Sequence, residues 1–296
     1  MIIVRLCGGL GNQLFQYAFG YSLSKAMKQE LVFDCSFYTN QPGYTGKRKV
    51  EIASLAISDL NAYEPSFLMK TLSNRYVGAV LRKLPTFSIP IGNGIRYVKE
   101  PIHKYVPNLQ CEGSTYYDGY WQTSKYFSNV REDLLEMFYP KEGFSSAVLE
   151  FFDTLKQENS VAVHIRKGDF KKKGFRTIGH PLPISYYEKA IEFCKEKLGN
   201  PVFYIVSDNP DWVKECLHVD ADIRYVSDYV TGDALTDIFC ISNCRNGIAS
   251  ASTFSWWGNW LRKTEGLVVV PNRSYYNEFF WETDWVKLDY DEEPNA

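Results

Sequence analysis

The sequence predicts an α/β protein with parallel sheets, and three observations support this class. Short runs of apolar and β-branched residues recur along the chain, and segments of helical length separate them. One such segment, from Leu14 to Met27, carries its apolar residues on a single face at helical spacing. Charged and hydroxyl side chains gather where two of the apolar runs end, which is where parallel sheets bind ligands.

The expected elements suggest two domains. The strands are expected at 2–6, 31–33, 161–166, 202–206, 223–226, 247–249 and 267–270, and the helices at 14–27, 184–198, 210–217, 233–243 and 254–262. Residues 36–115 are rich in Pro, Gly, Tyr and Asn, which predicts an irregular, loop-rich region. The chain alternates regularly from residue 158, which predicts a Rossmann-like domain. We therefore expect domains at 1–157 and 158–296, with a C-terminal tail that can pack back on the first.

Composition and charge narrow the classes of function. A net charge of −2 does not indicate binding to nucleic acid or to an anionic membrane. Seven cysteines without a CxxC pair are typical of a reduced, intracellular chain. The first residues do not form a signal peptide, and no run of 18 apolar residues occurs. We expect a cytoplasmic protein without a transmembrane segment, and a peripheral association with the inner face of the membrane stays open.

The stretch VAVHIRKGDF, residues 161–170, is an apolar strand that ends in charged residues. Because side chains alternate along a strand, His164 and Arg166 lie on the same face at its carboxyl end. Arginine binds phosphate through a planar fork of donors, and histidine can contact a base, a ribose or a phosphate oxygen. The alternative is a solvated strand end with a local ion pair between Arg166 and Asp169.

The stretch 233–262 predicts a helix, a short strand, a tight turn and a second helix. Four hydroxyl residues crowd the start of that second helix: Ser250, Ser252, Thr253 and Ser255. A helix start exposes unpaired N–H groups and attracts phosphate, while ordinary capping by one hydroxyl is the competing explanation. The aromatic residues that follow, Trp256, Trp257 and Trp260, either line a sugar or base pocket or form part of the core.

The stretch GGLGNQLFQYAFG, residues 8–20, follows the first expected strand. It is similar to the dinucleotide fingerprint GxGxxG, but Leu14 stands where the third small residue belongs. A tight turn that lets a ligand approach, with Asn12 and Gln13 presenting amides, is the alternative. Two D-x-D patterns, at 220–222 and 289–291, lie away from the expected ligand edge, so we expect no metal site.

Five stretches together resemble the bacterial α-1,2-fucosyltransferase family. They are GGLGNQLFQYAFG, DGYWQTSKYF (118–127), VAVHIRKGDF, FYIVSDNPDW (203–212) and STFSWWGNWL (252–261), which span residues 8–261. The resemblance implies a GT-B fold, in which two Rossmann-like domains face a cleft, with the acceptor on the N-terminal side. It implies an inverting, metal-independent enzyme without cofactors, which transfers L-fucose from GDP-β-L-fucose to the 2-hydroxyl of a β-galactoside glycan.

The resemblance and the motifs assign roles to particular residues. Catalysis is expected of Arg166, Asp169 and Asn12; donor binding of His164, Arg166, Asp208, Asp237, Ser252, Thr253, Phe254 and Ser255; and acceptor or other contacts of Gly11, Gln13 and Trp256. The family pattern H-x-R-R-x-D has Lys167 in place of its second arginine here. Asp169 and His164 both stay open as the base. The alternatives are a fucosyltransferase of another linkage or acceptor, a non-catalytic glycan- or nucleotide-sugar-binding protein, and an NAD-dependent oxidoreductase.

Overall fold

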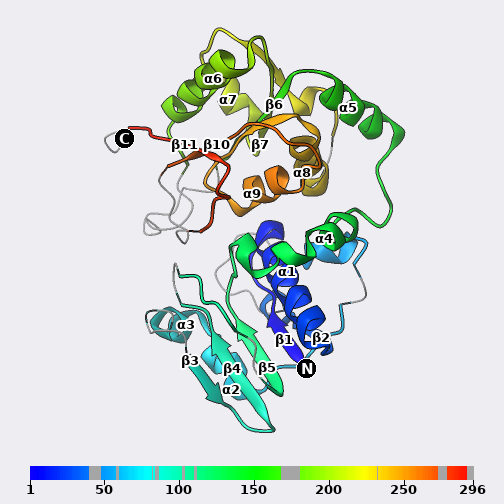
Figure 1. Ribbon diagram of the computed structural model, residues 1–296, viewed down its shortest axis with the longest axis vertical. Helices are drawn as coiled ribbons and strands as arrows, with labels where there is room; N and C mark the ends of the chain where they lie inside the picture. Colours follow the sequence, from blue (N-terminus) through cyan, green and yellow to red (C-terminus); the bar gives the residue numbers. More distant parts are fainter. Residues whose placement is uncertain are drawn as a thin grey trace. The chain divides into compact units, whose positions relative to one another are not determined.

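The computed structural model describes residues 1–39, 48–57, 60–81, 83, 87–101, 104–109, 112–167, 181–231, 233–272 and 279–291. These residues form two compact units (Figure 1). The first comprises residues 1–142 with Phe279 and Phe280, and the second comprises 143–272 and 281–291. The division lies between Glu142 and Gly143, fifteen residues before the expected boundary. The helix 146–157 falls in the second unit because its apolar face packs on that unit's sheet.

The first unit contains a five-stranded sheet in the order β2-β1-β5-β4-β3. The strands are β1 (Ile2–Arg5), β2 (Leu31–Asp34), β3 (Phe87–Pro90), β4 (Ile95–Lys99) and β5 (Ser114–Asp118). All neighbours are parallel except β3, which pairs antiparallel with β4 at the edge. The helices are α1 (Leu10–Met27), α2 (Phe67–Leu72), α3 (Arg75–Leu81) and α4 (Arg131–Met137). The region 36–115, expected to be loop-rich, therefore supplies two strands, the first residues of β5 and two short helices.

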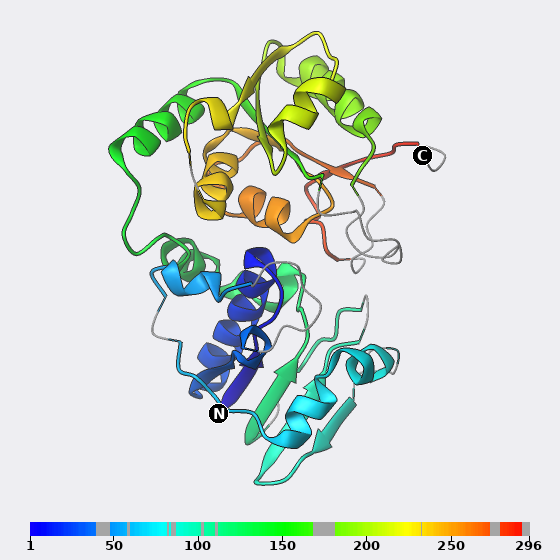
Figure 2. The ribbon, with the colours of Figure 1, turned by 180° about the vertical axis from the view of Figure 1, so that it is seen from behind.

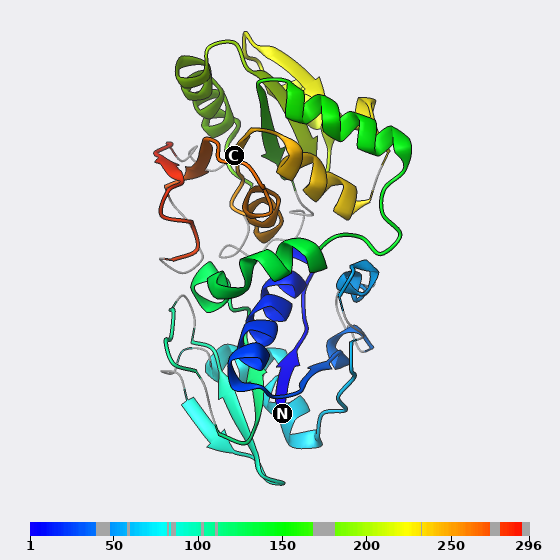
Figure 3. The same cartoon turned by 45° about the vertical axis from the view of Figure 1, so that its right-hand side comes forward.

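The second unit contains a six-stranded, wholly parallel sheet in the order β11-β10-β9-β6-β7-β8. Its strands are β6 (Ser160–Ile165), β7 (Val202–Ser207), β8 (Asp222–Tyr225), β9 (Asn246–Ile248), β10 (Val268–Pro271) and β11 (Val286–Leu288). Its helices are α5 (Ser146–Gln157), α6 (Ile184–Leu198), α7 (Pro210–Cys216), α8 (Ala234–Asn243) and α9 (Thr253–Trp260). Figure 3 shows α6 on one side of the sheet and α5 with α8 on the other. The expected α/β class with parallel sheets is confirmed.

Alternation along the strands of the second unit produces its two cores. Val161, Val163 and Ile165 of β6 face the cluster that α6 and α7 complete, with Tyr186 and Ile191 among its members. Ala162 faces the opposite cluster, which α5 and α8 complete. His164 stands on the Ala162 face one step closer to the carboxyl end. The strand pattern therefore carries this side chain to the edge where ligands bind on parallel sheets.

A buried charge cluster closes the carboxyl edge of the first sheet. Asp118 at the end of β5 accepts from Arg5 Nη1 at 3.2 Å, from the Tyr97 hydroxyl at 2.6 Å, and from Lys99 Nζ. The side chains of Lys99 and Asp118 are both 1% exposed. Burial by itself raises the pKa of Asp118, but the two cations hold it well below its usual range. Asp118 is therefore the anion that balances two cations on neighbouring strands.

We predict that Asp118→Asn lowers the free energy of unfolding by about 3 kcal/mol, because it leaves buried cations uncompensated. A carboxyl whose pKa is depressed by folding contributes stability above its unfolded-state pKa, and this stability is lost as the pH falls. Acid should therefore destabilise the wild type more steeply than the variant. Urea unfolding at pH 7 and at about pH 3, below the unfolded-state pKa of the carboxyl group, measures both effects.

Asp133→Asn is the matched control for this prediction, since Asp133 pairs with Lys25 at the surface. Surface pairs contribute less than about 1 kcal/mol. Equal losses in the two variants would contradict the role given to Asp118.

Candidate functional site

The end of β6 and the start of α9 meet in the second unit. The Nδ1 atom of His164 lies 2.8 Å from the Ser250 hydroxyl, and its ring stacks on Phe254 with centroids 5.2 Å apart. Arg166 donates from Nη1 to the Ser252 hydroxyl at 3.4 Å. The structure thus brings together two motifs that are 86 residues apart in the sequence.

His164 is a neutral imidazole at physiological pH. Burial first, and the nearby Arg166 charge second, lower its pKa from 6.5 to about 3, although Asp208 acts in the opposite direction. A group with such a low pKa is a weak base. The imidazole is suited instead to hydrogen bonding and stacking, and the structure argues against the expectation that His164 takes the acceptor proton.

The hydroxyl side chains around the start of α9 stabilise the local fold through hydrogen bonds to the backbone. Ser252 caps α9 by accepting from the amide of Phe254 at 3.3 Å, and the Ser255 hydroxyl accepts from the amide of Ser250 at 3.1 Å. Ordinary capping therefore explains Ser252, and a turn closure explains Ser255. Thr253, 9% exposed, begins the helix. The groups that remain available to an anion are the backbone N–H groups at the start of α9 and the nearby Arg166 guanidinium.

Asp208 supports the end of β6. It accepts a hydrogen bond at 2.8 Å from the backbone amide of Lys167, while Asn209 caps α7 through the amide of Trp212 at 3.0 Å. The Lys167 ammonium lies 4.8 Å from the centre of the Trp212 ring, a cation–π geometry. The lysine that departs from the family pattern thus contacts an aromatic ring within its own unit.

Asp237 is a partly buried carboxyl group on α8. Burial first, and the neighbouring Asp233 second, raise its pKa to about 6. Asp233 caps α8 by accepting from the amides of Leu235 and Thr236, both at 3.0 Å. Among the residues that the structure describes, none forms a hydrogen bond or ion pair with the Asp237 carboxyl group. A half-buried, unpaired carboxyl group of raised pKa is a candidate for ligand binding.

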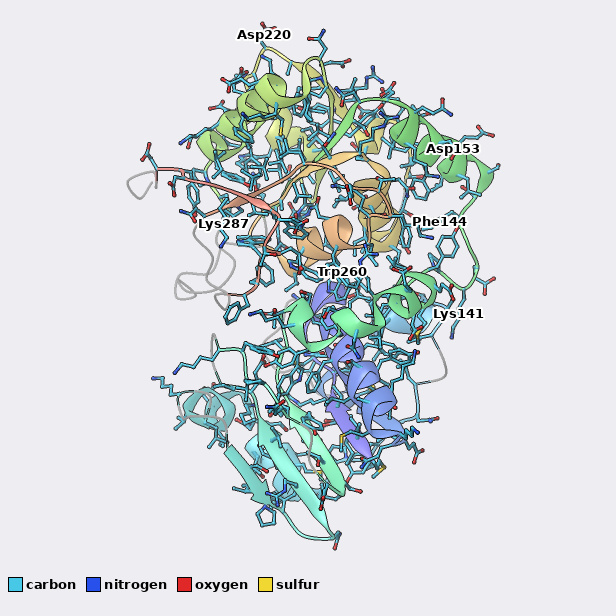
Figure 4. All side chains as sticks on the ribbon, in the orientation of Figure 1. Lys141, Phe144, Asp153, Asp220, Trp260 and Lys287 are labelled. Atoms are coloured by element: carbon cyan, nitrogen blue, oxygen red, sulfur yellow. The ribbon has the colours of Figure 1, made fainter. Side chains whose placement is uncertain are left out.

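Trp256 belongs to the core. It is 0% exposed, stacks on Trp260 at 5.6 Å between centroids, and packs edge-on against Trp257 at 4.8 Å. The ring of Trp285 lies 6.0 Å from that of Trp256 between centroids. This corrects the expectation that Trp256 contacts the acceptor, since the ring has no face exposed to a ligand. Figure 4 shows Trp260 at the opposite end of the second unit from Asp220, where the first D-x-D pattern lies.

Gln13 in the first unit is buried, and its side chain connects the turn before α1 to the backbone of residues 49–52. Its Nε2 donates to the carbonyls of Gly8 and Lys49, and its Oε1 accepts from the amides of Glu51 and Ile52. The side chain is 0% exposed, and these four bonds use its full capacity. The expectation that Gln13 presents its amide to an acceptor is therefore wrong. Gly11, also buried, lies in the first turn of α1.

Asn12 is partly exposed at the start of α1, and its Oδ1 accepts from Gln122 Nε2 at 2.9 Å. Gln122 follows a strained turn, in which Trp121 has a φ of +56°. The Glu100 carboxylate holds that turn by accepting from the amides of Tyr120 at 2.5 Å and Trp121 at 3.0 Å. The sequence assigned no role to Gln122 or Glu100. In the sequence, the only indication of such a role was that Gln122 lies within the stretch 118–127, and nothing pointed to Glu100.

Glycines let the chain turn tightly before α1. Gly8 has a φ of +86°, a conformation that side chains with a Cβ atom rarely adopt. A Cβ atom on Gly9 would lie 2.4 Å from Nη1 of Arg48. The turn thus allows the Arg48 guanidinium to approach the start of α1, which carries no side-chain cap.

The expected catalytic role of Asp169 and the expected absence of a metal site both stay predictions. Asp169 lies outside the described residues. In the part of the chain that the structure describes, no group of three or more His, Cys, Asp or Glu side chains has the geometry to hold a metal ion. Over the same residues, no helix combines the length and apolar character that crossing a membrane requires.

The sequence model of glycosyl transferase family 11 matches residues 1–290. The chain is 30% identical to the alpha-1,2-colitosyltransferase of Escherichia coli, over 98% of this chain and 99% of that protein. It is 26% identical to a galactoside 2-alpha-L-fucosyltransferase of Caenorhabditis elegans, over 99% of this chain and 76% of that protein. The solved structure of the fucosyltransferase NodZ from Bradyrhizobium matches 87% of this chain and 91% of that one, with 12% identity and a TM-score of 0.49.

We predict that His164 stays neutral from pH 5 to pH 8 in the folded protein. Arg166→Gln should raise the pKa of His164 because it removes a nearby cation, whereas Asp208→Asn should lower it because it removes an anion. NMR titration of the imidazole C–H signals follows both changes. Protonation of His164 near pH 6.5 in the wild type would contradict this environment.

Proposed function

The chain belongs to glycosyl transferase family 11, and from this premise we propose that it transfers L-fucose from GDP-β-L-fucose to the 2-hydroxyl of a β-galactoside glycan, with inversion. The family match confirms the resemblance found in the sequence, and the chain is a glycosyltransferase. The observation that carries the finer proposal is the meeting of His164, Arg166 and the start of α9 at one edge of the second sheet. Ligands of parallel sheets bind at that edge.

Arg166 is the group that stabilises the leaving diphosphate in this proposal. Breaking the bond between the sugar and GDP leaves growing negative charge on phosphate oxygens, and fixed cations and N–H donors lower the energy of that charge. The Arg166 side chain is exposed, and among the described residues it contacts the neutral Ser252 hydroxyl. Its charge therefore stays available to a ligand, and the start of α9 adds backbone N–H groups on the same side.

Asp237 is the group that we assign to the guanine base. Guanine carries two neighbouring N–H donors on one edge, and an ionised carboxylate can accept from both. The unpaired carboxyl group of Asp237 has this capacity, and its partial burial favours binding a ligand that excludes water. The aromatic ring of Phe254, held by stacking on His164, provides a flat surface close to Arg166.

The acceptor hydroxyl must lose its proton as the new bond forms. Asp169 and His164 are the base candidates by their position in the sequence, and the low pKa of His164 favours Asp169. Asn12 cannot act as an effective base, and we assign it to orienting the acceptor or the transferred sugar. Gln122 and the turn that Glu100 holds would then position Asn12, since Gln122 donates to its Oδ1 atom.

The transferred sugar is the least constrained part of the proposal. The names of the two relatives agree on transfer to a 2-position, but one names colitose and the other L-fucose. Colitose differs from L-fucose in lacking the 3-hydroxyl. A site that hydrogen-bonds this hydroxyl rejects the analogue strongly, whereas a site that ignores it accepts both sugars. GDP-colitose is therefore the second donor to test.

We predict product formation from GDP-β-L-fucose with lactose as acceptor in the presence of EDTA, with an α-1,2 linkage read by NMR. Arg166→Ala should lower kcat at least about a hundredfold, because it removes a donor that acts mainly on charge in the transition state. GDP binding by calorimetry is measured in parallel. If the wild type binds GDP but transfers no fucose, other acceptors and GDP-colitose are tested next. If the wild type neither binds GDP nor transfers fucose, the proposal is refuted.

The matched control for Arg166→Ala is Arg245→Ala. Arg245 is an exposed arginine of the same unit, and it donates to the Lys156 carbonyl at the amino side of β9. Its substitution should leave transfer unchanged. A near-wild-type rate in Arg166→Ala would remove Arg166 from its role.

We further predict that GDP binding weakens as the pH falls through about 6. The pKa of Asp237 is raised to about 6, so the carboxylate is ionised above this pH and becomes protonated below it. A protonated carboxyl group cannot accept from both guanine donors, and the affinity falls by up to about tenfold per pH unit. Calorimetry between pH 5 and pH 8 measures the slope.

Asp237→Asn separates this effect from the titration of GDP itself, whose terminal phosphate also has a pKa near 6. The variant should bind GDP weakly at every pH and retain only the slope of the phosphate. Identical slopes in both proteins would contradict the assignment of guanine to Asp237.

A further inference from the structure

Large hydrophobic side chains are exposed together on α2, α3 and β3 of the first unit. Phe67 is 86% exposed, Tyr76 79% and Val80 65%. With the less exposed Leu68, Val77 and Ile89, they form what we call the α2–α3 patch. These are six of the nine large hydrophobic side chains that stand out as exposed in the described part of the chain. Such clustering is uncommon on soluble proteins and marks an interaction surface.

The opposite face of the two helices fixes the direction in which the patch points. Met69 of α2 is 2% exposed and packs against Ile3, Tyr97 and Tyr116 of the sheet. The Ser66 hydroxyl caps α2 by accepting from the amide of Met69 at 3.3 Å. Figures 1 and 2 show α2 and α3 along one face of this sheet. Since the sheet is already covered by the inner side chains, Phe67 and Tyr76 point away from it.

The charged residues of the segment that carries the patch are mostly cations. Residues 65–99 contain six Lys or Arg residues and no Asp or Glu: Lys70, Arg75, Arg82, Lys83, Arg96 and Lys99. Lys99 is buried in the Asp118 cluster, and Arg96 lies on the face of the sheet opposite α2, because its neighbour Tyr97 packs with Met69. Lys70 and Lys83, on and after the two helices, are exposed. Lys70 reaches Glu64 at 2.5 Å, just outside this window, but both side chains are largely in solvent. The whole-chain charge of −2 conceals this local concentration of cations.

We propose that the α2–α3 patch binds the surface of a membrane that contains anionic lipids. Aromatic and aliphatic side chains with flanking Lys and Arg are the combination that binds the boundary between headgroups and acyl chains. Cations close to such a surface are attracted by its negative potential. A second copy of this chain is a poorer occupant, because a two-fold interface would place one cationic patch against another. The proposal does not depend on the sugar that the enzyme transfers.

Sedimentation with vesicles tests the proposal on the full chain. Vesicles of phosphatidylcholine with 30% phosphatidylglycerol should bind the protein, and pure phosphatidylcholine should bind it weakly. Phe67→Ser with Val80→Ser should lower the partition coefficient at least about tenfold, because two apolar side chains leave the lipid. Lys70→Gln with Lys83→Gln should lower it by about fivefold for each cation removed, and added salt should weaken wild-type binding.

Two controls distinguish the patch from general effects. Leu149→Ser removes a hydrophobic side chain, 42% exposed, from α5 of the second unit, and Lys156→Gln with Lys214→Gln removes two exposed cations there. Both should leave binding unchanged. All variants lie at exposed positions, so circular dichroism and GDP binding should match the wild type.

Three results would overturn the proposal. They are no binding of the wild type to anionic vesicles, equal binding by the patch variants, and a self-association in light scattering that the patch substitutions abolish. Failure of the transfer assay would leave this test untouched, since it measures lipid binding alone.

Discussion

Parallel pairing of strands is the constraint on which both units depend. When strands run in the same direction, their carboxyl ends meet at one edge, and the residues there cannot all be apolar because loops and helix starts begin beside them. In the first sheet this edge holds Arg5, Lys99 and Asp118. In the second sheet it holds His164 with Arg166 immediately after it. The polar character of both edges follows from the direction of the strands.

The two edges differ in how their charge is balanced. In the first unit, Asp118 neutralises Arg5 and Lys99 inside the protein, so that edge stabilises the fold. In the second unit, Arg166 contacts a neutral hydroxyl, and Asp237 on α8 lacks a charged or hydrogen-bonding partner among the described residues. Charges of both signs that lack an opposite partner among the described residues suit the proposed donor, which carries a diphosphate and a base with N–H donors. This difference is the basis of our proposal that the second unit binds the donor.

The first unit combines a held polar group with an exposed apolar surface. Asn12 is kept in place through Gln122 and a backbone turn that is strained at Trp121, and such strain persists only where surrounding contacts enforce it. The α2–α3 patch lies on the face of the sheet that α2 and α3 cover. Under our two proposals, Asn12 would position the acceptor and the α2–α3 patch would bind lipid, a combination that suits glycans attached to membranes.

The sequence by itself determined the α/β class, the strands β1, β2 and β6 to β10, and the two motifs that meet at the second edge, because alternation and helical spacing are local patterns. Tertiary structure decided the rest. Gln13 and Trp256 looked available in the sequence, but packing buries both. Gln122 gained its contact with Asn12 across 110 residues, and β3 to β5 became strands through pairing partners that no local pattern reveals. The pKa values of His164 and Asp237 depend on burial and on charges from other elements, which only the folded chain provides.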